Sequence, residues 1–434
     1  MRPPLEREVG SLLEPHPTLR VPVPAYDGRS LSNVTSSVVR ALGHEVTGEP
    51  SLLPPLANDL DPFDGRRAEG PIVVVLVDAM GFSAFLRAAD PAAHGAPADW
   101  LARARPITSV FPTTTTVALT SLSTAESPSR HGVVGYRMFL PHFGVVAEIL
   151  RMTPWGVPQS DTLVRSEWSP SMISGVPNIF RRGVPATALS NAEFEGSGFT
   201  RMIYDGATFT GFSSASDLAH LLSEVLRHRT PPGLVFLYWG ELDTVQHLRG
   251  PRPEFTAFEA AQVHRILAAA CRGVDPVTAK ATTILITSDH GQVSADRSAE
   301  VAIDAEPTIL PHLLRPPTGD RRAGFFTARP GHLEPLTAAL AARLPAGHRI
   351  LPMSLATSAG LFGPTPNHPE LSERLGDLLV LVPSPAALTY RLPGTPARGR
   401  FLLGAHGGLE PEELVVPLIR GSLSELAGPR PPRS

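Results

Sequence analysis

Cysteine and lysine are almost absent from this chain of 434 residues, in which Cys271 is the one cysteine and Lys280 the one lysine. A single cysteine excludes an internal disulfide and a zinc site built from several thiolates. The 38 basic and 41 acidic residues leave a formal net charge of −3, and arginine carries nearly all of the positive charge. Because such a chain has no basic field, we expect no nucleic-acid-binding surface.

Long apolar runs are also missing. No segment approaches the roughly 18–20 consecutive apolar residues of a membrane-spanning helix. Residues 1–28 contain no continuous apolar stretch of the length found in signal peptides. We therefore expect a cytoplasmic protein that does not bind a membrane. Hydrophobic residues nevertheless make up 42% of the chain, so it can form a large core.

Three segments share one shape, a short apolar run that ends at or near an aspartate: residues 71–80 (PIVVVLVDAM), 233–243 (GLVFLYWGELD) and 282–291 (TTILITSDHG). Apolar runs without alternation are typical of strands covered on both faces, as in parallel sheets. Helical patterns occur at residues 217–227, 255–270 and 336–344. The alternation of the two predicts a doubly wound α/β fold, whose ligands bind beyond the carboxyl ends of the strands.

Two regions interrupt this alternation, at about residues 135–216 and about residues 301–400. The first is rich in Gly, Ser, Thr and aromatic residues, and the second combines Pro-rich turns with one helix and one strand-like run. We expect both to be insertions that cover the site of a domain formed by residues 71–422. Residues 1–70 are then an N-terminal extension that packs on this domain, and residues 423–434 a disordered tail.

Carboxylates and histidines gather at the predicted strand ends. Asp243 and His247 are four residues apart and would share one face of a helix. Asp289 and His290 form a second pair, directly after a predicted strand. Taken singly, the first pair is explained as well by a helix cap and the second as well by a strand-end turn. Taken together, mixed carboxylate and imidazole ligands suit zinc, with manganese or iron as alternatives, and two ions could assist displacement at phosphorus. The full set is Asp78, Asp243, His247, Asp289, His290 and His406.

A run of four threonines, residues 113–116 in SVFPTTTTVALT, precedes a helical pattern in which Leu119 and Leu122 face inward. A hydroxyl at a helix N-terminus lies at the positive end of the macrodipole, where free N–H groups can hold phosphate oxygens. A nearby metal ion would lower the pKa of that hydroxyl and make it a nucleophile. Thr113 or Thr114 could instead be the N-cap of the helix, so the run by itself does not identify a nucleophile.

In this order, the motifs VVVLVDAMG, FPTTTT, ELDTVQH, SDHG and AHGG resemble the alkaline phosphatase superfamily, and within it the nucleotide pyrophosphatase/phosphodiesterase branch. The resemblance extends over about residues 71–420. It implies an α/β/α three-layer sandwich with a mostly parallel central sheet and inserted cap segments. It also implies two divalent metal ions, Zn²⁺ or alternatively Mn²⁺. One ion would be held by Asp78, Thr115, Asp289 and His290, and the other by Asp243, His247 and His406.

The resemblance implies that Thr115 is the nucleophile of a hydrolase that cleaves phosphodiester or pyrophosphate bonds through a phospho-threonyl intermediate. The substrate would be a small phosphorylated molecule, with nucleotides among the candidates. The resemblance implies an asparagine that helps bind the phosphoryl oxygens three residues after Thr115, where this chain has Ala118. Backbone N–H groups, or an arginine such as Arg137, Arg165 or Arg201, are the candidate replacements. The alternatives are a phosphomonoesterase, a phosphonate hydrolase or a phosphomutase of the same superfamily, or a non-catalytic metal- or nucleotide-binding protein.

Overall fold

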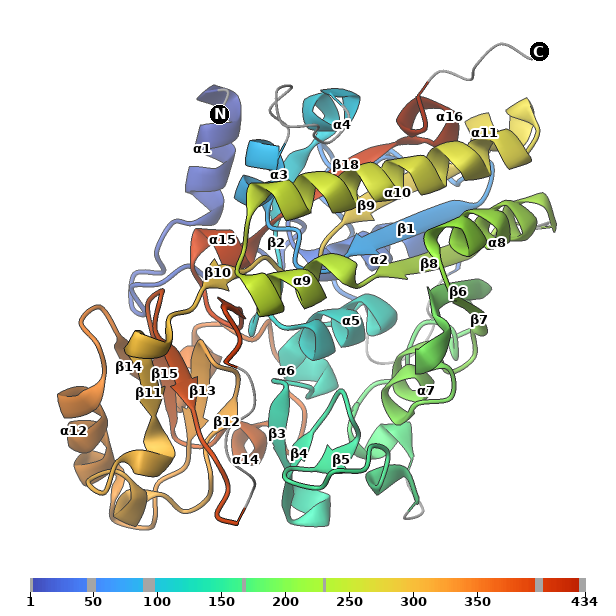
Figure 1. Ribbon diagram of the computed structural model, residues 1–434. Helices are drawn as coiled ribbons and strands as arrows, with labels where there is room; N and C mark the ends of the chain where they lie inside the picture. Colours follow the sequence, from blue (N-terminus) through green and yellow to red (C-terminus); the bar gives the residue numbers. More distant parts are fainter. Residues whose placement is uncertain are drawn as a thin grey trace.

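Two sheets of seven strands each organise the part of the chain that the computed structural model describes, residues 3–44, 52–88, 98–165, 169–228, 232–394 and 401–428 (Figure 1). The first is the central sheet. Its strands are β1 (Ile72–Val77), β2 (Arg105–Thr108), β6 (Ala186–Asn191), β7 (Thr208–Phe212), β8 (Leu234–Trp239), β9 (Thr283–Thr287) and β18 (Val415–Ser422). Their order is β2-β18-β9-β1-β8-β6-β7.

The three strands predicted from apolar runs are neighbours in this sheet. β1 pairs in parallel with β8, where Ile72 lies opposite Leu234, and with β9, where Ile72 lies opposite Thr283. β6 pairs in parallel with β8 and β7, whereas β18 runs antiparallel to both of its neighbours. The sheet is therefore mostly parallel, and the carboxyl ends of β8, β1 and β9 meet at one edge.

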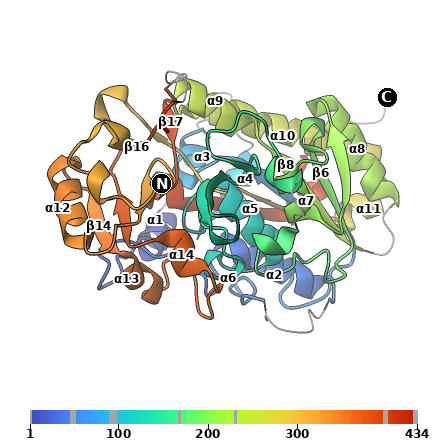
Figure 2. The same cartoon turned by 90° about the horizontal axis from the view of Figure 1, so that it is seen from below.

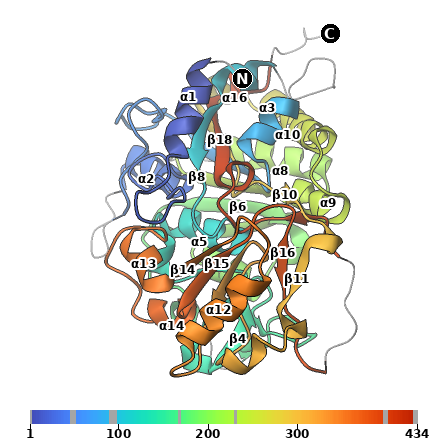
Figure 3. The same cartoon turned by 90° about the vertical axis from the view of Figure 1, so that its left-hand side faces the viewer.

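Alternate residues of β1 face two separate hydrophobic cores, which is why its sequence shows no polar alternation. Val74 belongs to the core formed with α2 (Leu31–Ala41) and α5 (Thr115–Thr124). Val75 belongs to the core formed with α3 (Phe82–Ala88), α8 (Ala215–His228) and α10 (Pro253–Gly273). Figures 1 and 3 show these helices on opposite faces of the sheet, which confirms the predicted three-layer sandwich.

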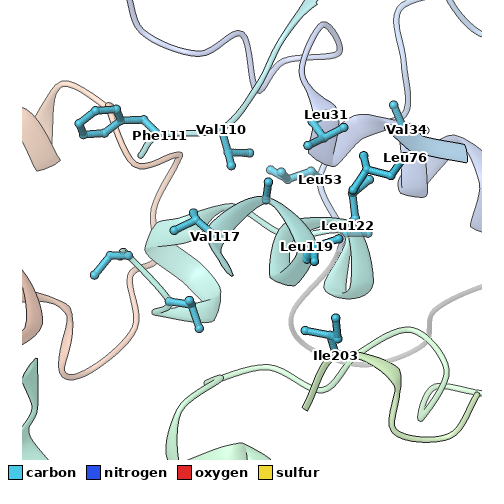
Figure 4. Close-up of a cluster of buried hydrophobic side chains, with 14 of the residues drawn as sticks. Leu31, Val34, Leu53, Leu76, Val110, Phe111, Val117, Leu119, Leu122 and Ile203 are labelled. Carbon is cyan, nitrogen blue, oxygen red and sulfur yellow. The ribbon is translucent and has the colours of Figure 1, made fainter. Parts of the chain in front are cut away.

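Helix α5 is buried along its length, because residues 116–124 are all buried. Figure 4 shows its side chains among those of the neighbouring elements, with Ile203 of α7 (Gly198–Tyr204) on one side and Leu31 of α2 on the other. Leu119 and Leu122 are 5% and 1% exposed, so the prediction that they face inward is confirmed. The burial holds the N-terminus of α5 in one place.

The second sheet, the cap sheet, is built from both predicted insertions and lies below the central sheet in Figure 1; Figure 2 shows it from beneath. The two insertions join where Gly319 pairs with Arg137. Its strands, in sheet order, are β14 (Arg349–Pro352), β15 (Leu378–Leu381), β13 (Ala323–Phe326), β12 (Thr318–Gly319), β3 (Arg137–Leu140), β4 (Val145–Glu148) and β5 (Thr153–Pro154).

The structure corrects two of the boundaries expected from the sequence. Residues 135–216 are not all insertion, because β6 and β7 belong to the central sheet; Thr, Ser and Gly within these strands conceal them in the sequence. A disordered tail does not begin at residue 423, because α16 (Leu423–Leu426) is capped by Ser422 and buries both of its leucines. Residues 429–434 of that predicted tail lie outside the described residues.

The N-terminal residues contribute to both cores. Leu5 and Leu12 of α1 (Pro3–Leu12) lie in the core with α10, and Leu31 and Val34 of α2 lie in the core with α5. No helix in the described ranges has the length and apolar composition needed to cross a membrane. The other helices are α4 (Ala98–Arg103), α6 (Pro128–His131), α9 (Glu241–Arg249), α11 (Pro276–Ala281), α12 (Leu333–Arg343), α13 (Met353–Ser358), α14 (Leu371–Leu375) and α15 (Pro411–Leu414).

Short elements complete the fold. β10 (Val293–Ser294) pairs with β17 (Gly404–Ala405), and β11 (Glu300–Ala302) pairs with β16 (Ala387–Thr389). The 3₁₀ helices are η2 (Pro141–Phe143), η3 (Leu163–Arg165), η4 (Pro170–Met172), η5 (Ala192–Phe194), η6 (Arg297–Ala299), η7 (Ile303–Ala305) and η8 (Leu310–His312).

Candidate active site

Three of the predicted metal ligands follow the carboxyl ends of two neighbouring strands. Asp78 directly follows β1, and Asp289 and His290 follow β9. Because β1 and β9 pair in register, these residues meet, and one ligand atom from each lies within 4.8 Å of the others. All three residues are buried. We refer to Asp78, Asp289 and His290 as the strand-end triad.

The other three predicted ligands form a second group, the helix–loop triad. Asp243 and His247 lie one turn apart in α9, and His247 Nε2 is 3.3 Å from Asp243 Oδ1, which confirms that they share a face. His406, directly after β17, brings its ligand atom within 4.8 Å of theirs. The rings of His406 and His290 stack with centroids 4.0 Å apart, so the two triads adjoin.

Each of the three histidines places Nδ1 beside a backbone carbonyl oxygen, at 3.0 or 3.1 Å. Since Nδ1–H then donates to the carbonyl, Nε2 is left unprotonated and can accept a metal ion. Burial lowers the pKa of His406 well below its usual value, and its two histidine neighbours act in the same direction. The carbonyls belong to Gly291 beside His290, Gly404 beside His247 and Thr113 beside His406.

The carboxylates of the strand-end triad each have one oxygen engaged by the protein and one oxygen free. Tyr238 donates its hydroxyl hydrogen to Asp78 Oδ2, and two backbone N–H groups donate to Asp289 Oδ1 at 2.9 and 3.1 Å. Asp78 Oδ1 and Asp289 Oδ2 are buried and have no hydrogen-bond partner among the described residues. Burial, and then the charges of Asp289 and Asp243, raise the pKa of Asp78 well above its usual value. Buried acceptors of this kind are costly unless paired, and a divalent cation would pair them.

The threonine run places Thr115 at the start of α5, beside the strand-end triad. Its Oγ1 lies 3.2 Å from His290 Nε2, and Thr115 is the partly exposed member of the run, since the other three are buried. Thr114 occupies the N-cap position with φ −144° and ψ 146°, but its side chain makes no capping hydrogen bond. The prediction that Thr113 or Thr114 is the N-cap is therefore confirmed for Thr114, whose backbone occupies the cap position while its hydroxyl makes no capping hydrogen bond.

Thr113 and Thr116 have structural partners. Thr113 Oγ1 donates to the carbonyl of Gly408 at 2.8 Å and accepts from the N–H of Gly407 at 3.1 Å. It therefore holds the glycine-rich loop that carries His406. Thr116 Oγ1 donates to the carbonyl of Gly135 at 3.1 Å, at the start of the cap segment. The four hydroxyls have different surroundings, and the one that faces both the triad and the solvent is that of Thr115.

Two glycines allow the close approaches that the site needs. A Cβ at Gly291 would lie 1.9 Å from the carbonyl oxygen of Glu412, so no other residue fits between the loop after β9 and α15. Gly407 adopts φ +111°, in the left-handed region, and a Cβ there would also meet Asp320 at 2.6 Å. Both loops that carry histidine ligands therefore depend on glycine.

A cavity of about 510 Å³ opens beside the helix–loop triad, with His247 and His406 in its wall. Arg137, Trp155 and Tyr390 line it from the cap segments. Of the three arginines considered as phosphate ligands, Arg137 is thus the one in this cavity, whereas Arg201 is exposed on α7 and borders a different hollow. The side chain of Arg165 lies outside the described residues.

Ala118 does not face the site. Its side chain is 0% exposed and lies in the core between α5 and the central sheet. Ala118 itself therefore provides no ligand for phosphate. Which group takes the place of the family asparagine stays a prediction.

Several residues near the triads were not found from the sequence. Asp320, in the turn between β12 and β13, has Oδ2 3.8 Å from His406 Nδ1, and burial raises its pKa. Gln292 donates its amide hydrogen to Asp243 Oδ1. Its position directly after SDHG was a usable signal. Nothing in the sequence around Asp320 or Tyr238 indicated a site. Asp320 lies in the cap hairpin and Tyr238 lies within β8, so neither belongs to a motif at a strand end.

A buried ion pair ties the cap to the loop of His406. Arg322 Nη2 lies 3.2 Å from Glu413 Oε2 and 2.7 Å from Glu410 Oε1. Glu413 Oε1 in turn accepts the N–H of Gly408 at 2.8 Å. Because Arg322 is next to the hairpin turn at Asp320, this network fixes the cap relative to the helix–loop triad.

Residues 101–313 match a family model described as type I phosphodiesterase / nucleotide pyrophosphatase. Murine ectonucleotide pyrophosphatase/phosphodiesterase 5 is structurally similar, with 16% identity, a TM-score of 0.60, and alignment over 81% of this chain and 88% of that one. Phosphonoacetate hydrolase from Sinorhizobium meliloti 1021 has 19% identity, a TM-score of 0.55, and alignment over 82% and 92% of the two chains. No curated protein sequence matches the chain.

The similar solved structures establish the fold. The matched family is one of metal-dependent hydrolases, and the matched residues include β2, the threonine run, α9 and the SDHG loop. The clustered carboxylates and histidines provide a candidate metal site at the expected edge of the sheet. On these grounds residues 101–313 are similar to the type I phosphodiesterase/nucleotide pyrophosphatase family, and the chain has the fold of its alkaline-phosphatase-like neighbours. The family match indicates a hydrolase that acts on phosphoester bonds.

Proposed function

We propose that this protein cleaves phosphodiester or pyrophosphate bonds, with Thr115 as the nucleophile and a phospho-threonyl intermediate. The observation that carries the proposal is the placement of the Thr115 hydroxyl, which begins α5, is open to solvent and lies 3.2 Å from His290 Nε2. A nucleophile in this position can attack a phosphorus atom held by the free N–H groups at the start of the helix.

The two triads fit two divalent ions, because each offers imidazole nitrogen and carboxylate oxygen ligand atoms within 4.8 Å of one another. We expect Zn²⁺, with Mn²⁺ as the alternative. Asp78, Thr115, Asp289 and His290 would hold one ion, and Asp243, His247 and His406 the other. When bound, the ions supply positive charge that lowers the pKa of the nucleophile and neutralises charge on the phosphoryl group.

The protein's own residues provide the nucleophile and orient the metal ligands. Thr115 Oγ1 forms a bond to phosphorus while the bond to the leaving oxygen breaks; the hydroxyl proton passes to solvent, and the leaving oxygen takes up a proton from solvent. Water then attacks the same phosphorus, the phosphothreonine P–O bond breaks, and the phosphoryl product departs with the water oxygen while Thr115 regains its hydroxyl proton. Gln292 and Tyr238 orient Asp243 and Asp78 through hydrogen bonds, and Thr113 positions the loop of His406.

The substrate we propose is a small phosphorylated molecule. An inactive variant of the murine neighbour forms a complex with AMP, and the bacterial neighbour forms one with phosphonoacetate. A nucleotide-containing diester or pyrophosphate is therefore the first candidate, and a phosphonate the second. A non-catalytic binding protein is disfavoured because the threonine and all six candidate ligands are present and assembled.

The test is an activity screen of the protein reconstituted with Zn²⁺ or Mn²⁺. We expect bis-p-nitrophenyl phosphate to be cleaved faster than p-nitrophenyl phosphate, and a chelator to abolish both activities. A clear preference for the monoester would transfer the assignment to a phosphomonoesterase. Absence of turnover with every diester, pyrophosphate and phosphonate tested would leave the non-catalytic alternative. Mass spectrometry of acid-quenched reactions should find a phosphate on the peptide that contains Thr115.

A further inference from the structure

The cavity beside the helix–loop triad carries more positive than negative side chains. It extends from His247 and His406 to the cap, where aromatic rings form part of its wall. A site that handled only the reacting phosphate would have no need of charged groups this far into the cap. The positively charged residues of the lining are Arg137, Arg297, Arg321 and Arg391, and the negatively charged ones are Glu300 and Asp320.

Arg137 is held in place but only partly neutralised. It opens β3, and its guanidinium lies 4.0 Å from the centroid of the Trp155 ring. Its nearest carboxylate is Glu148, at 3.5 Å, which has a closer partner in Arg151 at 2.8 Å. The Nε atom of Arg137 is buried and has no hydrogen-bond partner among the described residues. Arg137 therefore keeps a charge that Glu148 only partly offsets.

Arg321 is the second fixed charge in this wall. Its Nη1 donates to the carbonyls of Leu402 at 3.1 Å and Gly404 at 3.3 Å. The same carbonyl of Gly404 accepts from His247 Nδ1, so Arg321 is attached to the backbone that orients a helix–loop ligand. Burial lowers the pKa of Arg321, whereas the charges of Asp320 and Glu300 raise it and the charge of Arg137 lowers it. Arg137 and Arg321 line the same cavity.

We propose that Arg137 and Arg321 form a subsite for a second anionic group of the substrate, a phosphate or carboxylate on the substituent attached to the reacting phosphorus. The inference rests on the proposed function and specifies its substrate class: a phosphoric diester or anhydride whose substituent carries its own negative charge. An anion bound in this wall would be attracted by both partly buried guanidinium groups and would accept charge-assisted hydrogen bonds from them. Trp155 and Tyr390, with ring centroids 5.6 Å apart, form the adjoining apolar wall.

The experiment compares three phosphonates. Each has one phosphonate group that we expect to bind at the triads. Methylphosphonate has no second anion, 3-phosphonopropionate adds a carboxylate, and propane-1,3-diphosphonate adds a phosphonate. Their affinities are measured by calorimetry on metal-loaded Thr115→Ala protein, and as inhibition constants against bis-p-nitrophenyl phosphate in the protein with Thr115. Each measurement is repeated with Arg137→Gln, Arg137→Lys and Arg321→Gln. Arg201→Gln, at an exposed arginine outside this cavity, is the matched control.

We expect at least one of the two extended probes to bind about tenfold or more tightly than methylphosphonate, as a charge-assisted contact allows. Arg137→Gln and Arg321→Gln should each remove most of that gain, Arg137→Lys should restore part of it, and Arg201→Gln should keep it. The probe that gains identifies the second anion as carboxylate or phosphate. Equal affinities for all three probes, or a gain that survives both glutamine variants, would overturn the subsite. If the protein cleaves no phosphoester, the calorimetry still decides the subsite, because it does not depend on turnover.

Discussion

The two triads of this protein adjoin but are built differently. The side chains of the strand-end triad are at most 2% exposed, and they project from neighbouring strands of the central sheet. In the helix–loop triad, Asp243 and His247 are 19% and 20% exposed, and His406 belongs to a loop that the cap fixes through Arg322 and Glu413. The first triad is therefore set by the sheet alone, whereas the second requires the cap and faces the cavity.

This difference suggests a division of roles. Buried carboxylate oxygens without hydrogen-bond partners would be stabilised by a cation, and we propose that a cation at the strand-end triad activates Thr115. His247 and His406 of the more open triad line the cavity in which we propose that the substrate binds. We therefore expect changes to the two triads to have separable effects on metal retention, on stability and on turnover.

The largest effect is expected from Thr115→Ala, which should lower turnover by roughly 10³-fold or more while both metal ions stay bound. The side-chain ligands of both triads remain. The hydroxyls of Thr113, Thr114 and Thr116 have partners elsewhere, at Gly408, Asp320 and Gly135 respectively. Steady-state kinetics with bis-p-nitrophenyl phosphate and elemental analysis of the same sample provide the measurement.

Thr116→Ala is the control for that experiment, because Thr116 lies next in the helix and its hydroxyl bonds the backbone of Gly135. It should cost stability and leave turnover largely intact in the folded protein. Near-normal turnover in Thr115→Ala with loss in Thr114→Ala would show that the nucleophile has been assigned to the wrong residue.

The next effect concerns metal content. The reconstituted protein should hold about two ions per chain, and Asp289→Asn and Asp243→Asn should each hold about one. The ion retained by Asp243→Asn lies in the buried triad, so it should be extracted by a chelator more slowly than the ion retained by Asp289→Asn. Elemental analysis over a time course of chelation gives both quantities. Equal extraction rates would remove the distinction between the triads.

A smaller effect should follow when a single orienting hydrogen bond is removed. Gln292→Leu deletes the donor to Asp243, and Tyr238→Phe deletes the donor to Asp78. Each should weaken one ion by about 10- to 100-fold, because residues of this kind fix the ligand geometry. Competition with a chromogenic chelator measures the two affinities. If Gln292→Leu weakened both ions equally, the two triads would behave as one coupled site.

The smallest effect is expected on the free energy of unfolding at acid pH, and it comes from His368, which lies outside both triads. It tests acid unfolding independently of metal loss. Burial, and then the charge of Arg374, lower the pKa of His368 from 6.5 to about 4. Because the folded pKa is lower, the unfolded chain binds the proton first, and stability falls as the pH falls from about 6.5 towards 4. The slope is at most about 1.4 kcal/mol per pH unit.

Urea unfolding of metal-free protein at pH 7 and pH 5 should reveal this loss, and His368→Gln should reduce it. The Nδ1 atom of His368 accepts the N–H of Glu370 at 3.1 Å, a bond that protonation would remove and that a glutamine oxygen can retain. An unchanged pH dependence in the variant would assign the acid sensitivity to other groups.

The sequence was most informative where the signal is local. Apolar runs identified β1, β8 and β9, and the four-residue spacing of Asp243 and His247 placed them on one face of α9. It was least informative where short polar strands complete a sheet: β6 and β7 were mistaken for insertion because Thr, Ser and Gly conceal their period.

What the sequence by itself determined is the chemical inventory: which residues can bind a metal, which hydroxyls precede a helix, and which segments become the central strands. Only the tertiary structure decided which of these meet. The β1–β9 pairing brings Asp78 to Asp289 across 211 residues, and the Gly319–Arg137 pairing joins the two cap segments beside His406. The physical reason is that local patterns report the environment of one element, whereas strand pairing and cap docking are set by cores to which distant segments contribute together.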